Sequence, residues 1–157
     1  MNTATVIFLR KGKHILLAKK KRGFGVGKWN GPGGKIEPGE SLLDTVTREC
    51  QEEIAVTPIS PCKIAQLHFY FPEGQTDWLV HVFECRDWEG KPAESEEMAP
   101  RWYHLDKIPY ADMWEDDEHW LPHVLQGKNL IGHFDFDEDE KLLPETVRLE
   151  FVDSFEG

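Results

Sequence analysis

Short apolar runs separated by polar segments mark most of this chain as a succession of strands. Residues 5–9 and 14–18 are apolar with Lys11-Gly12-Lys13 between them, a pattern typical of antiparallel strands joined by a tight turn. Further runs predict strands over residues 63–71, 78–85, 101–105, 133–137 and 146–151. Residues 19–34 contain six glycines and predict a loop, because glycine reaches backbone conformations that other residues resist.

Two segments carry helical signals. Ser41 can cap a helix and Asp44 follows three residues later, an approximate capping box. A helix over residues 41–54 is predicted by apolar residues that recur every four positions, at Leu42, Val46, Cys50 and Ile54. A second helix, over about residues 116–126, would bury Trp120, Leu121, Val124 and Leu125. Because strands and helices mix without strict βαβ alternation, we expect an α+β fold with a mixed β-sheet sandwiched between α-helices.

Length, charge and cysteine content narrow the class of protein. A chain of 157 residues and 18.2 kDa can build one core, so we expect a single domain over residues 1–157. The net charge of −11, from 18 lysines and arginines against 29 aspartates and glutamates, disfavours nucleic-acid binding. No apolar run approaches the roughly 20 residues of a membrane span, and the three cysteines are too scattered for disulfides or a thiolate zinc site. We therefore expect a monomeric, cytoplasmic protein without nucleic-acid or membrane partners.

Three glutamates project from one side of the first predicted helix. Glu49, Glu52 and Glu53 occupy positions i, i+3 and i+4, where like charges destabilise an exposed helix by roughly 0.2–0.5 kcal/mol per pair. A hard divalent cation such as Mg²⁺ or Mn²⁺ would turn this repulsion into coordination. Spacing alone favours the simpler interpretation, a solvated acidic face, so the residues upstream decide between the two.

The residues around this helix follow a longer pattern. From Gly34 the chain has the spacing G-x5-E-x7-R-E-C-x-E-E-x-A-V, ending at Val56. This resembles the Nudix box of the Nudix hydrolases, G-x5-E-x7-R-E-U-x-E-E-x-G-U with U aliphatic, and six of its seven fixed positions match over residues 34–56. Cys50 takes an aliphatic position. Ala55 replaces the last glycine, which normally permits a left-handed helix end, so the helix end can differ here.

The resemblance implies a loop–helix–loop platform for Mg²⁺, with Mn²⁺ possible. It makes Glu49, Glu52 and Glu53 catalytic metal ligands, adds the carbonyl of Gly33, and gives Arg48 the role of orienting the glutamates. Glu97, in a loop outside the box, is implied as a further metal ligand or as the general base. Cations between protein and phosphates would explain how an acidic chain holds a polyanion.

Segments outside the box extend the resemblance to Nudix hydrolases of oxidised purine nucleoside triphosphates, at constant spacing from about residue 5 to residue 136. These segments are residues 20–25, 29–31, 80–83, 94–98, 109–117 and 132–136. The resemblance implies a small-molecule nucleotide substrate, cleaved to monophosphate and pyrophosphate in sanitisation of the nucleotide pool. It assigns substrate binding to Asn30, Trp114, Asp116, Asp117, Lys20, Phe24 and Thr5.

The adjacent residues Asp116 and Asp117 are expected to share a proton. Two close carboxyl groups in a pocket cannot both ionise cheaply, so one should hold a proton and the pair should both donate and accept hydrogen bonds. Such a pair would accept keto and amino purine edges, with Trp114 stacked on the base. Without the resemblance, Asp116-Asp117 would be interpreted as a helix N-cap. Candidate pocket walls, each with core packing as the alternative, are Phe24, Phe69, Phe71, Trp78 and Met98.

Two alternative functions remain open at this point. The first is a Nudix hydrolase of another nucleotide, such as ADP-ribose, a dinucleoside polyphosphate or an alkylated purine triphosphate. The second is a non-catalytic nucleotide sensor, against which the intact Arg48 and three box glutamates argue. Trp78-Leu79 stands where relatives have a methionine and an acidic residue, and Pro32 replaces an aromatic; these changes bear on base preference rather than on the reaction.

Overall fold

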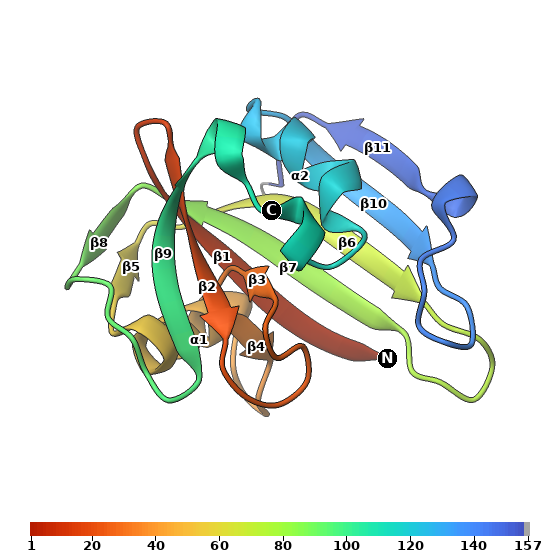
Figure 1. Cartoon of the computed structure of the whole chain (residues 1–157), viewed down its shortest axis with the longest axis horizontal. Helices are drawn as coiled ribbons and strands as arrows, with labels where there is room; N and C mark the ends of the chain where they lie inside the picture. Colours follow the sequence, from red (N-terminus) through yellow and green to blue (C-terminus); the bar gives the residue numbers. More distant parts are fainter. Residues whose placement is uncertain (156–157) are drawn as a thin grey trace.

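The computed structural model describes residues 1–155, which form eleven strands and two α-helices (Figure 1). The strands are β1 (Asn2–Lys11), β2 (His14–Lys20), β3 (Trp29–Asn30), β4 (Gly33–Lys35), β5 (Thr57–Ile59), β6 (Cys62–Tyr70), β7 (Trp78–Cys85), β8 (Asp87–Glu89), β9 (Met98–His104), β10 (Asn129–Asp135) and β11 (Arg148–Val152). The helices are α1 (Leu42–Ile54) and α2 (Asp117–Leu125), with short 3₁₀ helices η1 (Leu105–Lys107), η2 (Tyr110–Asp112) and η3 (Pro144–Thr146).

Nine of the strands form one mixed sheet. Its order is β11-β10-β6-β7-β1-β2-β3, with β4 paired to β1 and β9 paired to β2. The β1–β7 and β6–β10 pairs are parallel and the other pairs are antiparallel. The remaining two strands, β5 and β8, form a separate antiparallel ribbon. The predicted α+β class with a mixed sheet is confirmed.

The two helices cover opposite faces of this sheet (Figure 1). Successive side chains of a strand point to opposite faces, and β1 uses both. Phe8 packs in the core cluster that contains Trp120 of α2, while its neighbour Ile7 packs in the cluster that contains Val46 and Cys50 of α1. The sheet is therefore sandwiched between the helices, and the apolar stripe predicted for α1 is buried.

Both ends of α1 are defined by local contacts. The Ser41 hydroxyl accepts from the Asp44 amide and the Asp44 carboxylate accepts from the Ser41 amide, each at 3.1 Å, so the capping box is confirmed. At the other end Ala55 adopts φ 62° and ψ 33°, and its amide donates to the Gln51 carbonyl. The helix thus keeps the left-handed end that glycine usually provides, at a cost of roughly 1–2 kcal/mol for a residue with a Cβ.

Several strand boundaries differ from the sequence prediction because they are set by partners distant in the chain. β3 and the first two residues of β4 lie inside the predicted loop, where β2 and β1 supply their hydrogen bonds. β9 begins at Met98 rather than residue 101 because it pairs with β2 as far as Lys20, and β10 begins at Asn129 rather than residue 133 because it pairs with β6 and β11. β5 forms despite Pro58, since within residues 1–155 it pairs with β8 alone and has one free edge. Among the described residues, none of the helices has the length and apolar character of a membrane span.

Candidate active site

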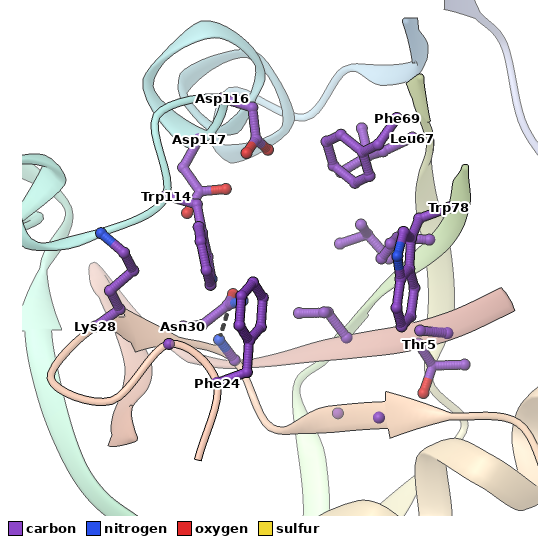
Figure 2. A pocket seen from close by; sticks show the side chains of 18 of the residues that line it. Thr5, Phe24, Lys28, Asn30, Leu67, Phe69, Trp78, Trp114, Asp116 and Asp117 are labelled. Atoms are coloured by element: carbon purple, nitrogen blue, oxygen red, sulfur yellow. Dashed lines mark hydrogen bonds between the residues drawn. The ribbon is translucent and has the colours of Figure 1, made fainter. Parts of the chain in front are cut away.

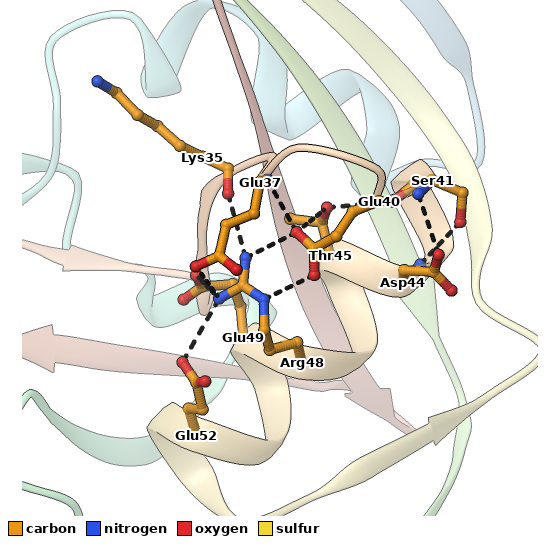
Figure 3. Close-up of polar contacts among 9 residues, drawn as sticks. All are labelled: Lys35, Glu37, Glu40, Ser41, Asp44, Thr45, Arg48, Glu49 and Glu52. Atoms are coloured by element: carbon orange, nitrogen blue, oxygen red, sulfur yellow. Dashed lines mark hydrogen bonds and ion pairs between the residues drawn. The ribbon is translucent and has the colours of Figure 1, made fainter.

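Arg48 is the centre of a charged network on α1 (Figure 3). Its Nε and Nη2 donate to the two oxygens of Glu40 at 2.7 and 2.9 Å, and its Nη1 donates to Glu49 at 2.6 Å. Nη1 also lies 3.5 Å from Glu52, and Nη2 donates to the Lys35 carbonyl at 3.2 Å. Hydrogen bonds from Arg48 favour the ionised carboxylate and lower the pKa of Glu40 to about 2. Arg48 therefore joins the loop before α1 to the glutamates on the helix.

Glu53 and Glu49 are packed against the short strand β4. Glu53 is 2% exposed, and its Oε2 accepts from the Gly33 amide at 3.2 Å. A Cβ on Gly34 would lie 2.7 Å from Oε1 of Glu49, so the close approach of strand and helix requires glycine there. Burial raises the pKa of Glu53 to about 8 and also raises that of Glu49, whose shift is opposed by Arg48. The Glu53 carboxyl group is thus buried and that of Glu49 partly buried beside β4.

The carboxylates of α1 and Glu97 are suitable ligands for a hard divalent cation, although they do not surround one common point in this structure. All the candidate side-chain ligands are carboxylate oxygens, which Mg²⁺ and Mn²⁺ prefer, and a cation beside buried Glu53 would favour its ionised form. Within residues 1–155, however, no three histidine, cysteine or acidic side chains come together as a metal cluster. The set predicted from the sequence is therefore dispersed here, because Glu52 is exposed and its carboxylate is turned to Arg48.

Glu97 lies outside α1 but close to it. It immediately precedes β9, it is exposed, and its Oε1 is 3.6 Å from Nη2 of Arg22. Its charge is a smaller contribution, after burial, to the raised pKa values of Glu49 and Glu53. The loop before β9 therefore brings a fourth carboxylate toward the glutamates of the helix.

A cavity of about 630 Å³ opens next to these carboxylates (Figure 2). It shares Gly33 and Gly34 of β4 with the glutamate cluster, so the two regions adjoin. All residues that the sequence assigned to substrate binding line it: Thr5, Lys20, Phe24, Asn30, Trp114, Asp116 and Asp117. The candidate walls also line it: Phe24, Phe69, Phe71, Trp78 and Met98. The volume is within the range of about 300–1,000 Å³ typical of small-molecule sites.

Asp116 and Asp117 are buried together where α2 begins, with exposures of 5% and 4%. Trp120 Nε1 donates to Oδ2 of Asp116 at 2.9 Å, whereas Oδ2 of Asp117 has no hydrogen-bond partner among the described residues. Burial raises the pKa of both carboxyl groups, and the charge of Asp116 raises that of Asp117 further. Two charges this close are disfavoured in a buried site, so the pair retains one proton. The Asp116 side chain makes no capping hydrogen bond to α2, which argues against the N-cap interpretation.

Trp114 forms an aromatic wall next to the aspartates (Figure 2). The Phe24 ring stacks on it with centroids 5.1 Å apart and planes at 28°, and Lys28 Nζ lies 5.1 Å from its ring. A Cβ on Gly25 would lie 2.8 Å from the indole, so the glycine-rich loop passes close to Trp114 because it lacks a side chain there. Phe24 is nonetheless 74% exposed, which places this ring at the mouth of the cavity.

Two further residues supply polar atoms to the cavity. Oδ1 of Asn30 accepts from the Gly31 amide at 2.8 Å, which fixes the orientation of the side chain and leaves its NH₂ group as the donor. Oγ1 of Thr5 is buried without a hydrogen-bond partner in residues 1–155. A few such groups in a largely apolar cavity are what orients a small ligand.

Some lining residues were missed by sequence reasoning, or were assigned to the core alone. They are Lys28, Leu67, Val80, Val82, Trp120 and Phe136. Leu67 and the valines alternate with residues of the other sheet face along β6 and β7, a period-2 signal that would have identified them together with Phe69 and Trp78. Trp120 is in the core as predicted, and it also provides the hydrogen bond to Asp116.

The chain is similar in sequence and in structure to known proteins. The NUDIX domain family matches residues 1–124. The "Oxidized purine nucleoside triphosphate hydrolase" of Mus musculus is 41% identical over 151 residues and covers 96% of each chain, and that of Danio rerio is 44% identical over 133 residues, 84% of this chain and 85% of the other. The crystal structure of a mutator MutT protein from Bacillus halodurans superposes with a TM-score of 0.83 at 31% identity, over 96% of this chain and 98% of that one.

Proposed function

The chain belongs to the NUDIX family of hydrolases, and we propose that it cleaves oxidised purine nucleoside triphosphates to monophosphate and pyrophosphate. The relatives from mouse and zebrafish carry that activity in their names. The observation that carries the proposal is the buried Asp116–Asp117 pair, placed in a cavity that adjoins the glutamates of α1 at Gly33 and Gly34.

In this proposal the cavity binds the base. Trp114 offers an indole face, and base–aromatic stacking is worth roughly 1–3 kcal/mol per base. Asp117 keeps its proton and donates, while ionised Asp116 accepts, so the pair can bind an edge that presents both an acceptor and a donor. Such a pair suits the keto and amino groups of 8-oxo-dGTP and 2-hydroxy-dATP alike. Asn30 adds a donor from the glycine-rich loop.

The glutamates of α1 serve the phosphates. NUDIX hydrolases use a divalent metal ion, and we propose Mg²⁺ held by Glu49, Glu52, Glu53, Glu97 and the Gly33 carbonyl, with Mn²⁺ able to replace it. The metal would supply charge neutralisation and polarise the phosphate for attack by water. Arg48 holds Glu49 and Glu52 in place. Lys20 lines the cavity, its charge opposes the rise that burial causes in the pKa of Glu53, and it adds positive potential beside the phosphate tail.

A substrate panel tests this proposal. Hydrolysis of 8-oxo-dGTP, 2-hydroxy-dATP, dGTP, dATP, ADP-ribose and a diadenosine polyphosphate should be compared with Mg²⁺ present and with excess EDTA. We expect higher kcat/KM for the two oxidised triphosphates, release of pyrophosphate rather than orthophosphate, and loss of turnover with EDTA. Preference for ADP-ribose or the dinucleotide would assign the chain to another branch of the family. No turnover of any compound would leave a nucleotide-binding protein without catalysis.

A further inference from the structure

The segment Glu94–Met98 connects three parts of the site. Met98 lines the cavity and is buried in the core beneath α1, and the adjacent Glu97 approaches the α1 glutamates. Ser95 fixes the segment as a tight turn, because its Oγ accepts from the amides of Glu97 and Met98, both at 3.2 Å, and its own amide donates to the Met98 carbonyl at 2.9 Å. The position of Glu97 therefore depends on what holds this turn.

Two basic side chains contact this segment: Arg22 lies near the carboxylates of Glu96 and Glu97, and Lys21 contacts the turn itself. Its Nζ forms an ion pair with Glu94 and donates to the Ser95 carbonyl at 2.8 Å. Its backbone amide donates to the Glu97 carbonyl at 2.8 Å, which continues the β2–β9 ladder one residue beyond the Lys20–Met98 pair. Lys21 thus contacts the first residue of the turn, its middle and the residue that carries the candidate catalytic carboxylate.

We propose that Lys21 is a positioning residue that fixes the turn at Ser95 and, through it, aligns Glu97 with the glutamates of α1. This inference deepens the proposed function and rests on it, because it treats Glu97 as part of the metal-binding set. Lys21 does not line the cavity and is not assigned a contact with the substrate, so its effect would be exerted through Glu97.

The glycine-rich loop that follows Lys21 does not need this anchor. Its own backbone hydrogen bonds close it: Lys20 N donates to Lys28 O, Gly27 N to Lys20 O and Val26 N to Gly23 O, at 2.8–3.2 Å. The loop that carries Phe24 should therefore keep its shape when the Lys21 side chain is changed. We therefore expect a change at Lys21 to alter the position of Glu97 at the metal site more than the binding of the base.

The test compares Lys21→Met with Lys21→Arg, and with Lys13→Met as a control from the exposed turn between β1 and β2. Mn²⁺ affinity without nucleotide, amide exchange at Glu97 and Met98, and kcat and KM for 8-oxo-dGTP are measured on the full chain. Loss of a residue bonded directly to a metal ligand typically weakens metal affinity or activity by roughly 10–100-fold; Lys21 acts one contact further away, so the lower end of that range is expected. For Lys21→Met we expect about 10-fold weaker Mn²⁺ binding, a similar fall in kcat, faster exchange at both amides and KM within about 2-fold.

Partial recovery in Lys21→Arg and wild-type behaviour in Lys13→Met complete the expected result. Wild-type Mn²⁺ affinity and amide exchange in Lys21→Met would overturn the inference, as would a change confined to KM. Ser95→Ala provides a second route to the same turn and should reproduce the slower turnover and faster exchange. If the unmodified chain fails to hydrolyse oxidised purine triphosphates, the proposed function fails, while Mn²⁺ affinity and amide exchange still decide the role of Lys21.

Discussion

Two regions of this protein bury carboxyl groups, and their surroundings differ. On α1, the glutamates lie next to the guanidinium of Arg48, the Gly33 amide and the charge of Lys20. In the cavity, Asp116 meets a neutral donor, the Trp120 indole, and Asp117 is left with an oxygen that has no partner within residues 1–155.

The difference shows how one functional group acquires two chemical roles. On α1, burial raises the pKa of Glu53 and Glu49, but Arg48, Lys20 and the Gly33 amide oppose the rise, so a bound cation can restore the charged form of both carboxylates. A carboxyl pair buried without a cation keeps a proton, and it can therefore both donate to and accept from a neutral base. Burial alone does not determine the role, because Glu53 and Asp117 are both buried.

Replacing a buried carboxyl group of α1 should reduce activity more than any other change considered below. In Glu53→Gln we expect kcat for the oxidised triphosphate to fall by roughly 10²–10⁴-fold, the usual contribution of a catalytic carboxylate, with KM changed little because the cavity is intact. Steady-state kinetics measures both constants. Glu118→Gln, at an exposed glutamate of α2, is the control and should behave as wild type. Retention of more than a tenth of the activity in Glu53→Gln would refute the role.

A change in the cavity should act on binding and should separate the two aspartates. Asp116→Asn removes the charged acceptor and should lower kcat/KM by about 10–100-fold, since a hydrogen bond to a charged group is worth roughly 1.5–3 kcal/mol. Asp117→Asn replaces a protonated acid by another neutral donor and should cost less. Kinetics on 8-oxo-dGTP establishes the order. A larger loss in Asp117→Asn would place the proton on Asp116.

The raised pKa of Asp117 predicts a pH dependence of the same pair. As the pH rises through this pKa, Asp117 loses its proton, a second charge enters the cavity and KM should increase. Below that pH the proton is retained and KM should be constant. Asp117→Asn cannot lose a proton, so its KM should stay flat across the range. An alkaline rise in KM that persists in this variant would assign the effect to another group.

A change at the C-terminal end of α1 should affect the stability of the fold slightly and leave catalysis unchanged. Ala55→Gly should stabilise the fold by about 0.5–1 kcal/mol, because the left-handed conformation of Ala55 costs more than glycine loses in unfolded-state entropy. Thermal denaturation would show a Tm higher by roughly 1–4 °C, with unchanged kinetics. Ala111→Gly, at an exposed position without positive φ, should not raise Tm. An unchanged Tm in Ala55→Gly would mean that the helix end is not strained.

Features with local causes were predictable from the sequence. The Ser41–Asp44 capping box and the apolar stripe of α1 depend on residues within one or two helical turns, and both are present. β4 and β5 were missed because their hydrogen bonds come from β1 and β8, far away in the chain. The left-handed conformation of Ala55 runs against the preference of alanine, so the residue type at this position did not predict it.

The candidate site likewise contains features that the sequence predicted and features that it did not. The α1 glutamates and the paired aspartates were singled out by the family resemblance, because spacing alone favoured a solvated acidic face and a helix N-cap. The hydrogen bond from Trp120 to Asp116 and the contacts of Lys21 to the Ser95 turn depend on how separate segments meet, and no spacing reveals them. The dispersed arrangement of the four carboxylates likewise follows from ion pairs with Arg48 and Arg22.

The central claim is that the α1 glutamates bind metal and the paired aspartates bind the base. Anomalous diffraction from crystals soaked with Mn²⁺ and 8-oxo-dGMP tests it most directly. We predict Mn²⁺ density against Glu49, Glu52 and Glu53, the oxidised base against Trp114 and the two aspartates, and no cation between Asp116 and Asp117. A manganese peak between the aspartates, or none along α1, would contradict the account.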